Sequence, residues 1–274
     1  MATRSPLELV DTSRAKEHLT MCIANDSGLP ILDRPPNAPT GSSLKLTSHD
    51  GTQFSAFHAL PESLTRVGVL VLPDMRGLAP FYEQLTLRLA DQGHAAIAID
   101  YYGRTAGTTP RTEQFPFMQH IMQVTAKTIG EDVISATQYL HTPQGGNCRK
   151  VLALGFCFGG RQAFLASAPR FTLAGVVGFY GALSFYPNGA PGPLQRVSEL
   201  SAPILGLFGG ADAGISADDV AAFDEALRIS GIEHEIVTYP EAPHGFFDIK
   251  FKEHAAACID VWQRVLAFIA AHSD

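Results

Sequence analysis

Six short apolar runs, separated by segments of helical length, set the strongest constraint on how this chain folds. Each run has five to seven residues and is rich in Val, Ile, Leu and Ala, as is typical of central parallel strands whose two faces are covered by helices. The runs are Val67–Leu72, Ala95–Ile99, Lys150–Leu154, Leu173–Phe179, Ile204–Phe208 and Glu235–Tyr239. The helical segments are Pro80–Gln92, Lys127–His141, Arg161–Ala168, Ala217–Ser230 and Glu253–Ala271. This alternation predicts an α/β fold with a mostly parallel central sheet and helices on both faces.

An alternating pattern of apolar and polar residues precedes these runs. The segment LKLTSHDGTQFSAFHAL, residues 44–60, carries the turn dipeptide Asp50-Gly51, which predicts an antiparallel β-hairpin. Upstream of it, residues 29–39 hold four prolines, a density that neither a helix nor a regular strand tolerates. We therefore expect an N-terminal extension over residues 1–41 and one α/β domain over residues 42–274, long enough to bury a substantial core.

Charge and cysteine content argue against several function classes. The chain carries 27 acidic and 20 basic side chains, a formal net charge of −7, so no broad basic surface for nucleic acid or an anionic membrane is expected. Its four cysteines, at positions 22, 148, 157 and 258, lack the spacing of a disulfide framework or a zinc site, which predicts free thiols and no metal. Charges interrupt the first 19 residues where a signal peptide would be apolar. We expect a cytoplasmic protein with no nucleic-acid or membrane partner.

The segment VLALGFCFGG, residues 151–160, predicts a nucleophile elbow centred on Cys157. An apolar strand leads into the G-x-C-x-G-G pattern, and a helix is expected to begin near Arg161. In such an elbow the small flanking residues let the helix pack close to the strand, while the nucleophile takes a strained backbone geometry. A cysteine near a helix N-terminus is also favoured as the thiolate, the form that attacks a carbonyl carbon. The alternative is that Cys157 is a buried small hydrophobic residue and that the glycines only make a turn.

Candidates for the acid and the base follow in the chain order nucleophile, acid, histidine that α/β-hydrolases use. Asp212 ends the segment FGGAD, which follows one apolar run, and His244 lies in APHGF, which follows the next. An imidazole can take the thiol proton and return it to a leaving group, while a carboxylate fixes its tautomer and stabilises the imidazolium. The alternatives are a surface histidine and a helix-capping aspartate, and Asp218 and Asp219 are competing carboxylates in the first turn of the next helix.

These segments resemble the dienelactone hydrolases, carboxymethylenebutenolidases that open a lactone ring in catechol and chlorocatechol breakdown. The resemblance runs from about Ser42 to the C-terminus and is most specific in GFCFGG, FGGAD and APHGF. It implies an α/β-hydrolase fold, no cofactor, and a catalytic triad of Cys157, Asp212 and His244. It also implies that the substrate is a small molecule with an ester or lactone bond.

The same resemblance implies roles for further residues. Asp74 occupies the position of a glutamate that contacts the nucleophilic cysteine and helps to control its ionisation. The backbone N–H groups of Met75 and Phe158 would form the oxyanion hole. Arg104 matches the first of two arginines that hold a substrate carboxylate, a task that suits the bidentate guanidinium, and Tyr180 matches a tyrosine near the pocket.

One position departs from the family pattern and leaves the substrate open. The second arginine would fall four residues beyond the histidine, where this sequence has Asp248, and a negative charge cannot replace it. Arg76 or Arg161 could compensate from neighbouring loops. The sequence therefore predicts hydrolysis of an ester or lactone, with dienelactone as the leading substrate and a broader carboxylesterase or thioesterase as the alternative. A non-catalytic ligand-binding protein of the same fold is the alternative of a different class, and the oligomeric state stays open.

Overall fold

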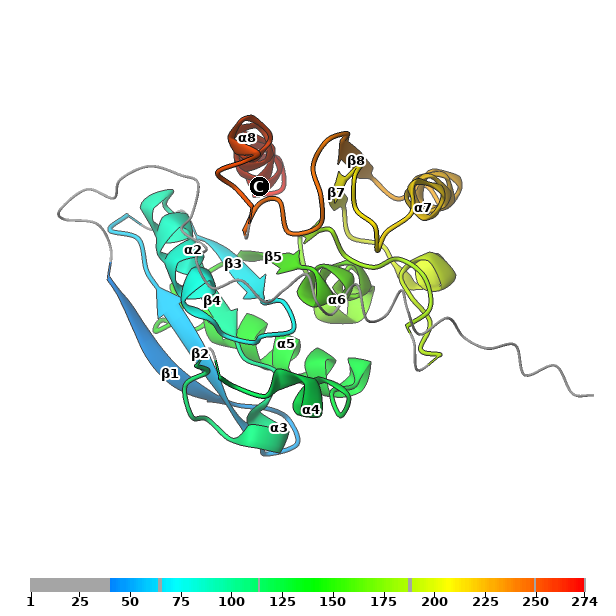
Figure 1. Cartoon of the computed structure of the whole chain (residues 1–274). Coiled ribbons are helices and arrows are strands. Elements are labelled where there is room, and N and C mark those ends of the chain that lie inside the picture. Colours follow the sequence, from blue (N-terminus) through cyan, green and yellow to red (C-terminus); the bar gives the residue numbers. More distant parts are fainter. Residues whose placement is uncertain (1–39, 64–65, 113, 187–188, 249, 274) are drawn as a thin grey trace, which may run out of the picture.

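Eight strands form one sheet in the order β1-β2-β4-β3-β5-β6-β7-β8 (Figure 1). The structure, a computed structural model, describes residues 40–63, 66–112, 114–186, 189–248 and 250–273, so nearly all of the expected N-terminal extension lies outside it. The strands are β1 Gly41–Thr47, β2 Gln53–Ala59, β3 Val67–Leu72, β4 Ala95–Ile99, β5 Lys150–Phe156, β6 Gly175–Phe179, β7 Ile204–Gly209 and β8 His234–Tyr239. The strands β1 and β2 pair antiparallel, β2 pairs antiparallel with β4, and all other neighbours are parallel. The predicted fold class and hairpin are confirmed.

The central strands are buried along their whole length. Every residue of β3, β4, β6 and β7 is buried, which explains why these strands appear in the sequence as unbroken apolar runs. The strands at the two edges, β1 and β8, alternate instead between partly buried and exposed positions.

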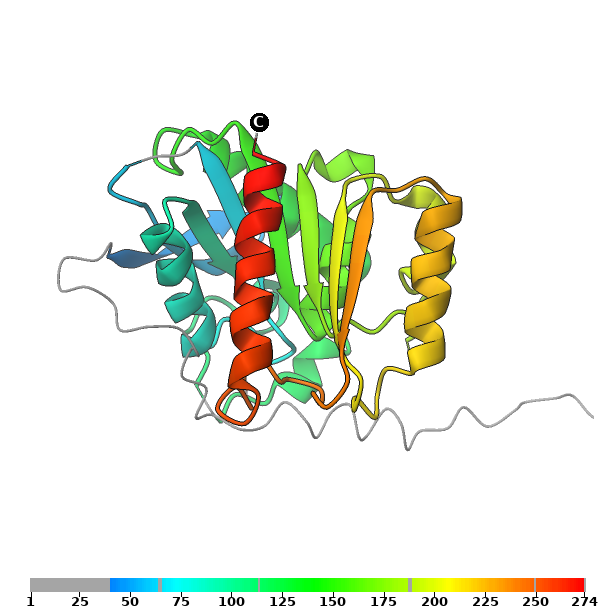
Figure 2. The same ribbon diagram turned by 90° about the horizontal axis from the view of Figure 1, so that it is seen from above.

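Helices cover both faces of the sheet (Figures 1 and 2). The helices α2 and α8 lie on one face, and α5 and α6 lie on the other. Residues 258, 261, 262, 265 and 269 of α8 are buried, a spacing that places them on one helical face. The helices are α2 Pro80–Asp91, α3 Gly103–Ala106, α4 Phe117–Ile121, α5 Ala126–His141, α6 Phe158–Ala166, α7 Ala217–Ile229 and α8 Ala255–Ala271, with 3₁₀ turns at Pro169–Phe171 and Leu194–Glu199. No helix among the described residues has the length and apolar character of a membrane span.

The start of α6 corrects one sequence expectation. The helix begins at Phe158, directly after the nucleophile candidate, and not near Arg161. Glycine is a poor helix former in general, so Gly159 and Gly160 suggested a turn where the chain is already helical. The short helices α3 and α4 were not expected either, because four or five residues are too few to show a helical periodicity.

The strand order reverses direction beside β3 and thereby positions the candidate site. From β3 the chain crosses to β4 on one side and later returns to β5 on the other side. The loops that follow β3 and β5 therefore face each other at the carboxyl edge of the sheet, the place where α/β sheets bind ligands. These loops carry Asp74 and Cys157.

His58 makes the stability of this fold depend on pH. It lies on β2, is 5% exposed, and has its Nδ1 atom 3.4 Å from the Tyr139 hydroxyl, while its Nε2 atom bonds to no other described residue. Burial lowers the pKa of His58 below 6.5. The unfolded chain then binds the proton more tightly than the folded chain does. The free energy of unfolding should therefore be highest above about pH 6.5 and decrease as the pH falls below this value. Urea unfolding between about pH 5 and 8 measures this, and a His58→Gln variant with an equal pH dependence would contradict it.

Candidate active site

Cys157 occupies a strained turn between β5 and α6. Its backbone has φ 53° and ψ −111°, a combination that non-glycine residues rarely adopt outside functional sites. Its N–H donates to the carbonyl of Phe179 at 2.9 Å, and its carbonyl accepts the N–H of Arg161 at 3.1 Å. These two bonds hold the backbone of Cys157 to the end of β6 on one side and to the first turn of α6 on the other. The Cys157 residue is 5% exposed.

Glycines on both sides of Cys157 permit this turn. A Cβ atom at Gly155 would lie 2.0 Å from the carbonyl oxygen of Gly159. A Cβ atom at Gly159 would lie 2.1 Å from the carbonyl oxygen of Leu72 and 2.3 Å from that of Pro73. The first turn of α6 therefore lies directly against the end of β3, and the loop that begins at Pro73 is held beside the elbow.

His244 and Asp212 form a buried pair. Nδ1 of His244 lies 2.7 Å from Oδ2 of Asp212, and both side chains are 1% exposed. The other carboxylate oxygen of Asp212 accepts the N–H of Gly214 at 2.8 Å. The two loops are also joined directly, because Ala211 donates its N–H to the carbonyl of Ala242 at 3.0 Å. The carboxylate thus fixes the orientation of the imidazole, as the sequence predicts for an acid and base pair.

The competing carboxylates lie elsewhere. Asp218 and Asp219 are in the first turn of α7, where Asp219 donates its N–H to Ser216 and accepts the hydroxyl of Ser184 at 2.9 Å. Among the described residues, Asp212 is the carboxylate bonded to His244.

Tyr180 connects the histidine with the elbow. It follows β6, which lies between β5 and β7, so it stands between the strand that leads to Cys157 and the strand that leads to Asp212. Its ring centroid is 4.9 Å from that of His244. Its backbone has a φ of 38°, and its hydroxyl is buried without a hydrogen bond to any described residue. Burial, and next the nearby negative charges, raise the pKa of Tyr180, so its hydroxyl stays protonated.

Asp74 is paired with Arg76 in the loop after β3. The buried Asp74 carboxylate accepts the backbone N–H of Arg76 at 2.7 Å and its Nε at 2.8 Å, and it also contacts Nη2. Nη2 of Arg76 lies 3.5 Å from Oδ2 of Asp248, whose side chain is 2% exposed. Burial alone would lower the pKa of the Arg76 guanidinium. The negative charges of Asp74 and Asp248 have a larger effect and raise this pKa. Arg76 therefore bridges two buried carboxylates.

Three buried tyrosine hydroxyls hold the backbone of the same loop. Tyr82 accepts the N–H of Asp74 at 3.0 Å, Tyr101 donates to the carbonyl of Pro73 at 2.8 Å, and Tyr102 donates to the carbonyl of Met75. The sequence analysis assigned no role to these three tyrosines and missed their hydrogen bonds. No local pattern could have indicated them, because each partner lies 8 to 28 residues away in the chain.

The two predicted oxyanion donors are backbone N–H groups beside the elbow. Phe158 is the first residue of α6, where an N–H has no acceptor within the helix. Met75 follows Asp74 in the loop that packs against α6 through Gly159. Neither N–H donates a hydrogen bond to another described residue.

The structure does not bring Arg104 together with the triad candidates. Arg104 lies in α3, beside the hairpin in Figure 1. Its guanidinium contacts Asp50 at 2.7 Å, Asp132 at 2.8 Å and the hydroxyl of Ser48 at 2.9 Å. These bonds tie α3 to the hairpin turn and to α5. The guanidinium is thus engaged by two carboxylates, an arrangement that does not support the expected carboxylate clamp.

The guanidinium of Arg161 is likewise engaged, in this case by backbone carbonyl groups. It donates to four backbone carbonyls in the loop after β6, at distances of 2.5 to 3.2 Å. It therefore fixes this loop. Arg76, the other arginine considered as a substitute, contacts Asp74 and Asp248 instead.

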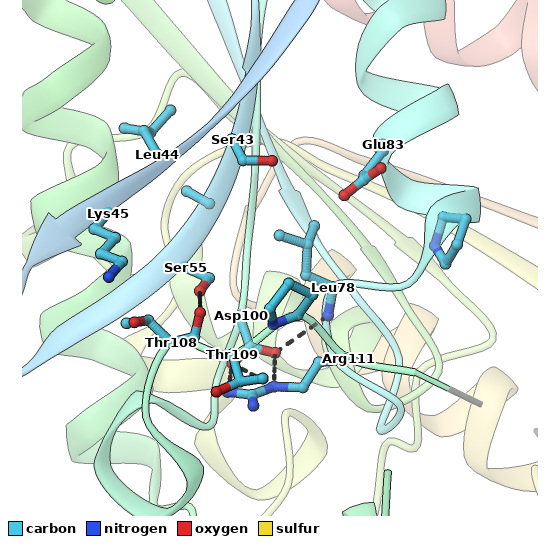
Figure 3. Close-up of a pocket in the computed structure, with 13 residues that line it drawn as sticks. Ser43, Leu44, Lys45, Ser55, Leu78, Glu83, Asp100, Thr108, Thr109 and Arg111 are labelled. Atoms are coloured by element: carbon cyan, nitrogen blue, oxygen red, sulfur yellow. Dashed lines mark hydrogen bonds and ion pairs between the residues drawn. The ribbon is translucent and has the colours of Figure 1, made fainter. Parts of the chain in front are cut away.

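A separate hollow lies on the hairpin side of the β3 loop (Figure 3). It has a volume of about 300 Å³ and includes none of the triad candidates. Its buried carboxylate, Asp100, is paired with Arg111 at 2.8 Å and also accepts the N–H of Leu78. The charges of this hollow thus balance each other. Within the described ranges, no group of three or more His, Cys, Asp or Glu side chains could hold a metal ion.

Comparison with known proteins gives consistent matches along the domain. Residues 54–273 match the model of the dienelactone hydrolase family. A Yersinia pestis protein provisionally named carboxymethylenebutenolidase is 31% identical over 231 residues, which cover 81% of this chain and 85% of that protein. An Escherichia coli K12 protein with the same provisional name is 31% identical, and the match covers 79% of this chain and 82% of that protein. The crystal structure of a provisionally named dienelactone hydrolase from Klebsiella pneumoniae superposes with a TM-score of 0.75 at 30% identity, covering 85% of this chain and 99% of that chain.

The contact between α6 and β3 can be tested through Gly159. A Gly159→Ala variant would force a Cβ atom against two backbone carbonyls, so we expect the free energy of unfolding to decrease by about 3 kcal/mol or more. Gly130→Ala is the matched control, because its nearest neighbour is the ring of Phe171 at 3.3 Å, and a helical alanine should change stability by less than about 1 kcal/mol. Urea unfolding measures both, and equal stability of the two variants would contradict the proposed close contact.

Proposed function

The chain belongs to the dienelactone hydrolase family, whose members are hydrolases of lactone and ester bonds, and we propose that Cys157 is its nucleophile. The observation that carries this proposal is the buried bond of 2.7 Å between His244 and Asp212, in loops that follow the elbow cysteine in the chain order that α/β-hydrolases use. The substrate class is a small-molecule carboxylic ester or lactone.

The proposed reaction has two acyl-transfer steps. The Cys157 sulfur attacks the carbonyl carbon, while His244 holds the thiol proton as an imidazolium that Asp212 stabilises. The oxyanion of the tetrahedral intermediate accepts the N–H groups of Met75 and Phe158. Collapse of this intermediate breaks the ester bond, and His244 gives its proton to the leaving oxygen. Water, deprotonated by His244, then attacks the thioester, releasing the carboxylic acid and returning the proton to the sulfur.

Asp74 is the group that we propose to control the ionisation of the nucleophile. Its loop packs against the first turn of α6 through Gly159. Its carboxylate is oriented by three contacts from Arg76. The position of this negative charge relative to the sulfur therefore depends on the ion pair with Arg76.

One alternative is favoured by particular observations, and a second follows from the fold alone. Arg104 is engaged by Asp50 and Asp132, and Asp248 stands where a second arginine is expected, which favours a broader carboxylesterase or thioesterase over a strict dienelactone hydrolase. A non-catalytic ligand-binding protein would keep the same fold without using Cys157. The variants described next separate these readings.

Replacement of the triad residues should abolish hydrolysis of aryl esters. We expect Cys157→Ala and His244→Ala to lower kcat/KM by about 10⁴-fold or more, and Asp212→Asn by about 10²-fold or more, because each removes part of one unit. Cys148→Ala is the control, since this cysteine is buried beside Gly68 near the start of β3 and precedes β5, whereas the elbow follows the other end of β5. Mass spectrometry should detect an acyl group on Cys157. Unchanged hydrolysis by Cys157→Ala would refute the proposed nucleophile.

The hydroxyl of Tyr180 should contribute to catalysis without contributing to stability. We expect Tyr180→Phe to lower kcat/KM by about tenfold through loss of a hydrogen bond to the substrate. Since this hydroxyl has no partner among the described residues, the free energy of unfolding should not decrease. The matched control is Tyr239→Phe, which removes a bond of 2.6 Å to Asp260 and should affect stability only. Loss of stability without loss of kcat/KM in Tyr180→Phe would refute this role.

A further inference from the structure

A buried ion pair lies at the carboxyl end of β4. Asp100 is the first residue after this strand, and its N–H donates to the carbonyl of Ser55 on β2 at 2.9 Å. Its carboxylate accepts Nη2 of Arg111 at 2.8 Å and Nε at 3.2 Å. The side chain of Asp100 is 0% exposed and that of Arg111 is 4% exposed. The strand end and the two-point contact together hold the carboxylate in one place.

The Asp100 carboxylate also binds the loop after β3, residues 73–79 (Figure 3). Its Oδ1 atom accepts the N–H of Leu78 at 3.3 Å. A Cβ atom at Gly77, whose φ is 80°, would lie 2.5 Å from the same oxygen, so the glycine permits the close approach of loop and carboxylate. The far end of the loop is therefore fixed by a charge that belongs to β4.

Tyr102 carries the same restraint to the middle of the loop. Its N–H donates to Oδ2 of Asp100 at 2.9 Å, and its hydroxyl donates to the carbonyl of Met75. Tyr102 is 0% exposed, and hydrogen bonds in such a buried environment are stronger than bonds in contact with water. Asp100 thus acts on the loop twice, directly at Leu78 and through Tyr102 at Met75.

The segment after α3 holds the other half of the ion pair. Nη2 of Arg111 donates to the carbonyl of Gly107 at 2.6 Å, and the guanidinium carbon lies 4.6 Å from the centroid of the Phe115 ring. These contacts engage the edge and one face of the guanidinium. The pair is therefore better suited to hold the loop after β3 than to bind a ligand in the adjoining hollow.

The peptide group between Asp74 and Met75 carries one of the two proposed oxyanion donors. The N–H of Asp74 donates to the Tyr82 hydroxyl at 3.0 Å on one side of this peptide, and the carbonyl of Met75 accepts the Tyr102 hydroxyl on the other. The direction of the Met75 N–H depends on both fixed points. An oxyanion donor has to be preorganised, because a displacement of about 1 Å can lower the rate by about 100-fold.

From this geometry we infer that the pair of Asp100 and Arg111 positions the oxyanion donor of Met75, with Tyr102 as the connecting group. Asp100 and Arg111 act through Tyr102 and Leu78, so they are positioning residues. The inference rests on the proposed function, because Met75 is an oxyanion donor only if Cys157 attacks a carbonyl carbon.

Two reactions of the same sulfur separate the position of the donor from a general effect on the structure. Acylation of Cys157 by 4-nitrophenyl butyrate passes through an oxyanion, whereas alkylation by iodoacetamide displaces iodide and forms no oxyanion. Both reactions need the sulfur and its ionisation. The ratio of their second-order rate constants therefore reports on the oxyanion donors. Stopped-flow release of 4-nitrophenolate measures the acylation, and mass spectrometry measures the alkylation.

We expect Asp100→Asn to lower the ratio of acylation to alkylation by about 30-fold or more, and Tyr102→Phe by about tenfold, because the Met75 donor loses its fixed direction. In steady-state hydrolysis kcat should decrease, while KM should change by less than about threefold, since the donor acts in the transition state.

Asp132→Asn is the matched control for Asp100→Asn. The side chain of Asp132 is 1% exposed and contacts Arg104 at 2.8 Å, but this pair joins α5 to α3. Both substitutions weaken a buried ion pair, so both should lower the free energy of unfolding. The ratio of acylation to alkylation should stay at the wild-type value in Asp132→Asn.

The outcomes separate this inference from the proposed function. Equal slowing of acylation and alkylation in Asp100→Asn, or an equal decrease of their ratio in Asp132→Asn, would assign the pair to stability alone and overturn the inference. If Asp100→Asn does not fold, Tyr102→Phe decides, because it removes a single hydroxyl, and an unchanged ratio there would also overturn the inference. Wild-type hydrolysis without an acyl group on Cys157 would instead overturn the proposed function, and the inference with it.

Discussion

The close contact between the first turn of α6 and the end of β3 is the constraint on which the candidate site depends. It exists because Gly155 and Gly159 have no side chain, so that the helix can start directly after Cys157 and lie against the carbonyls of Leu72 and Pro73. The contact sets the strained backbone of Cys157 and also places the Asp74 loop beside it. One packing arrangement thus positions the proposed nucleophile, both proposed oxyanion donors and Asp74.

The remaining parts of the site follow from the order of the strands. The strands β5, β6, β7 and β8 are neighbours in the sheet, and the loops after them carry Cys157, Tyr180, Asp212 and His244 in the same order. Parallel strands bring their carboxyl ends to one edge, so residues up to 87 positions apart in the sequence meet there. The buried pair of Asp212 and His244 is then a consequence of two adjacent loops that hydrogen-bond to each other.

Sequence reasoning was most successful where the physical cause is local. Buried strands need apolar runs, an elbow needs glycines, and a hairpin turn needs a dipeptide such as Asp50-Gly51, so these features were predicted and lie where expected. The choice of ion-pair partner is not local. Arg104 was expected at the substrate, but the hairpin turn and α5 provide two carboxylates for it, and no pattern within its own segment indicates that these elements meet. For the same reason, the bridge of Arg76 between Asp74 and Asp248, which lies 172 positions from Arg76, was not expected; the sequence suggested only that Arg76 or Arg161 could compensate for the missing arginine.

The tyrosine hydroxyls that hold the β3 loop have a consequence for how this site can diverge. Tyr82, Tyr101 and Tyr102 fix the backbone of residues 73–75, and the oxyanion role proposed for Met75 uses its main-chain N–H alone. A substitution at position 75 that keeps this backbone in place would therefore keep the donor, even though the Met75 side chain itself packs in the core. The same holds for Phe158, whose N–H direction is set by α6. Because both proposed donors belong to the main chain, a substitution at either position would act on the packing of the core and not on the donor group itself.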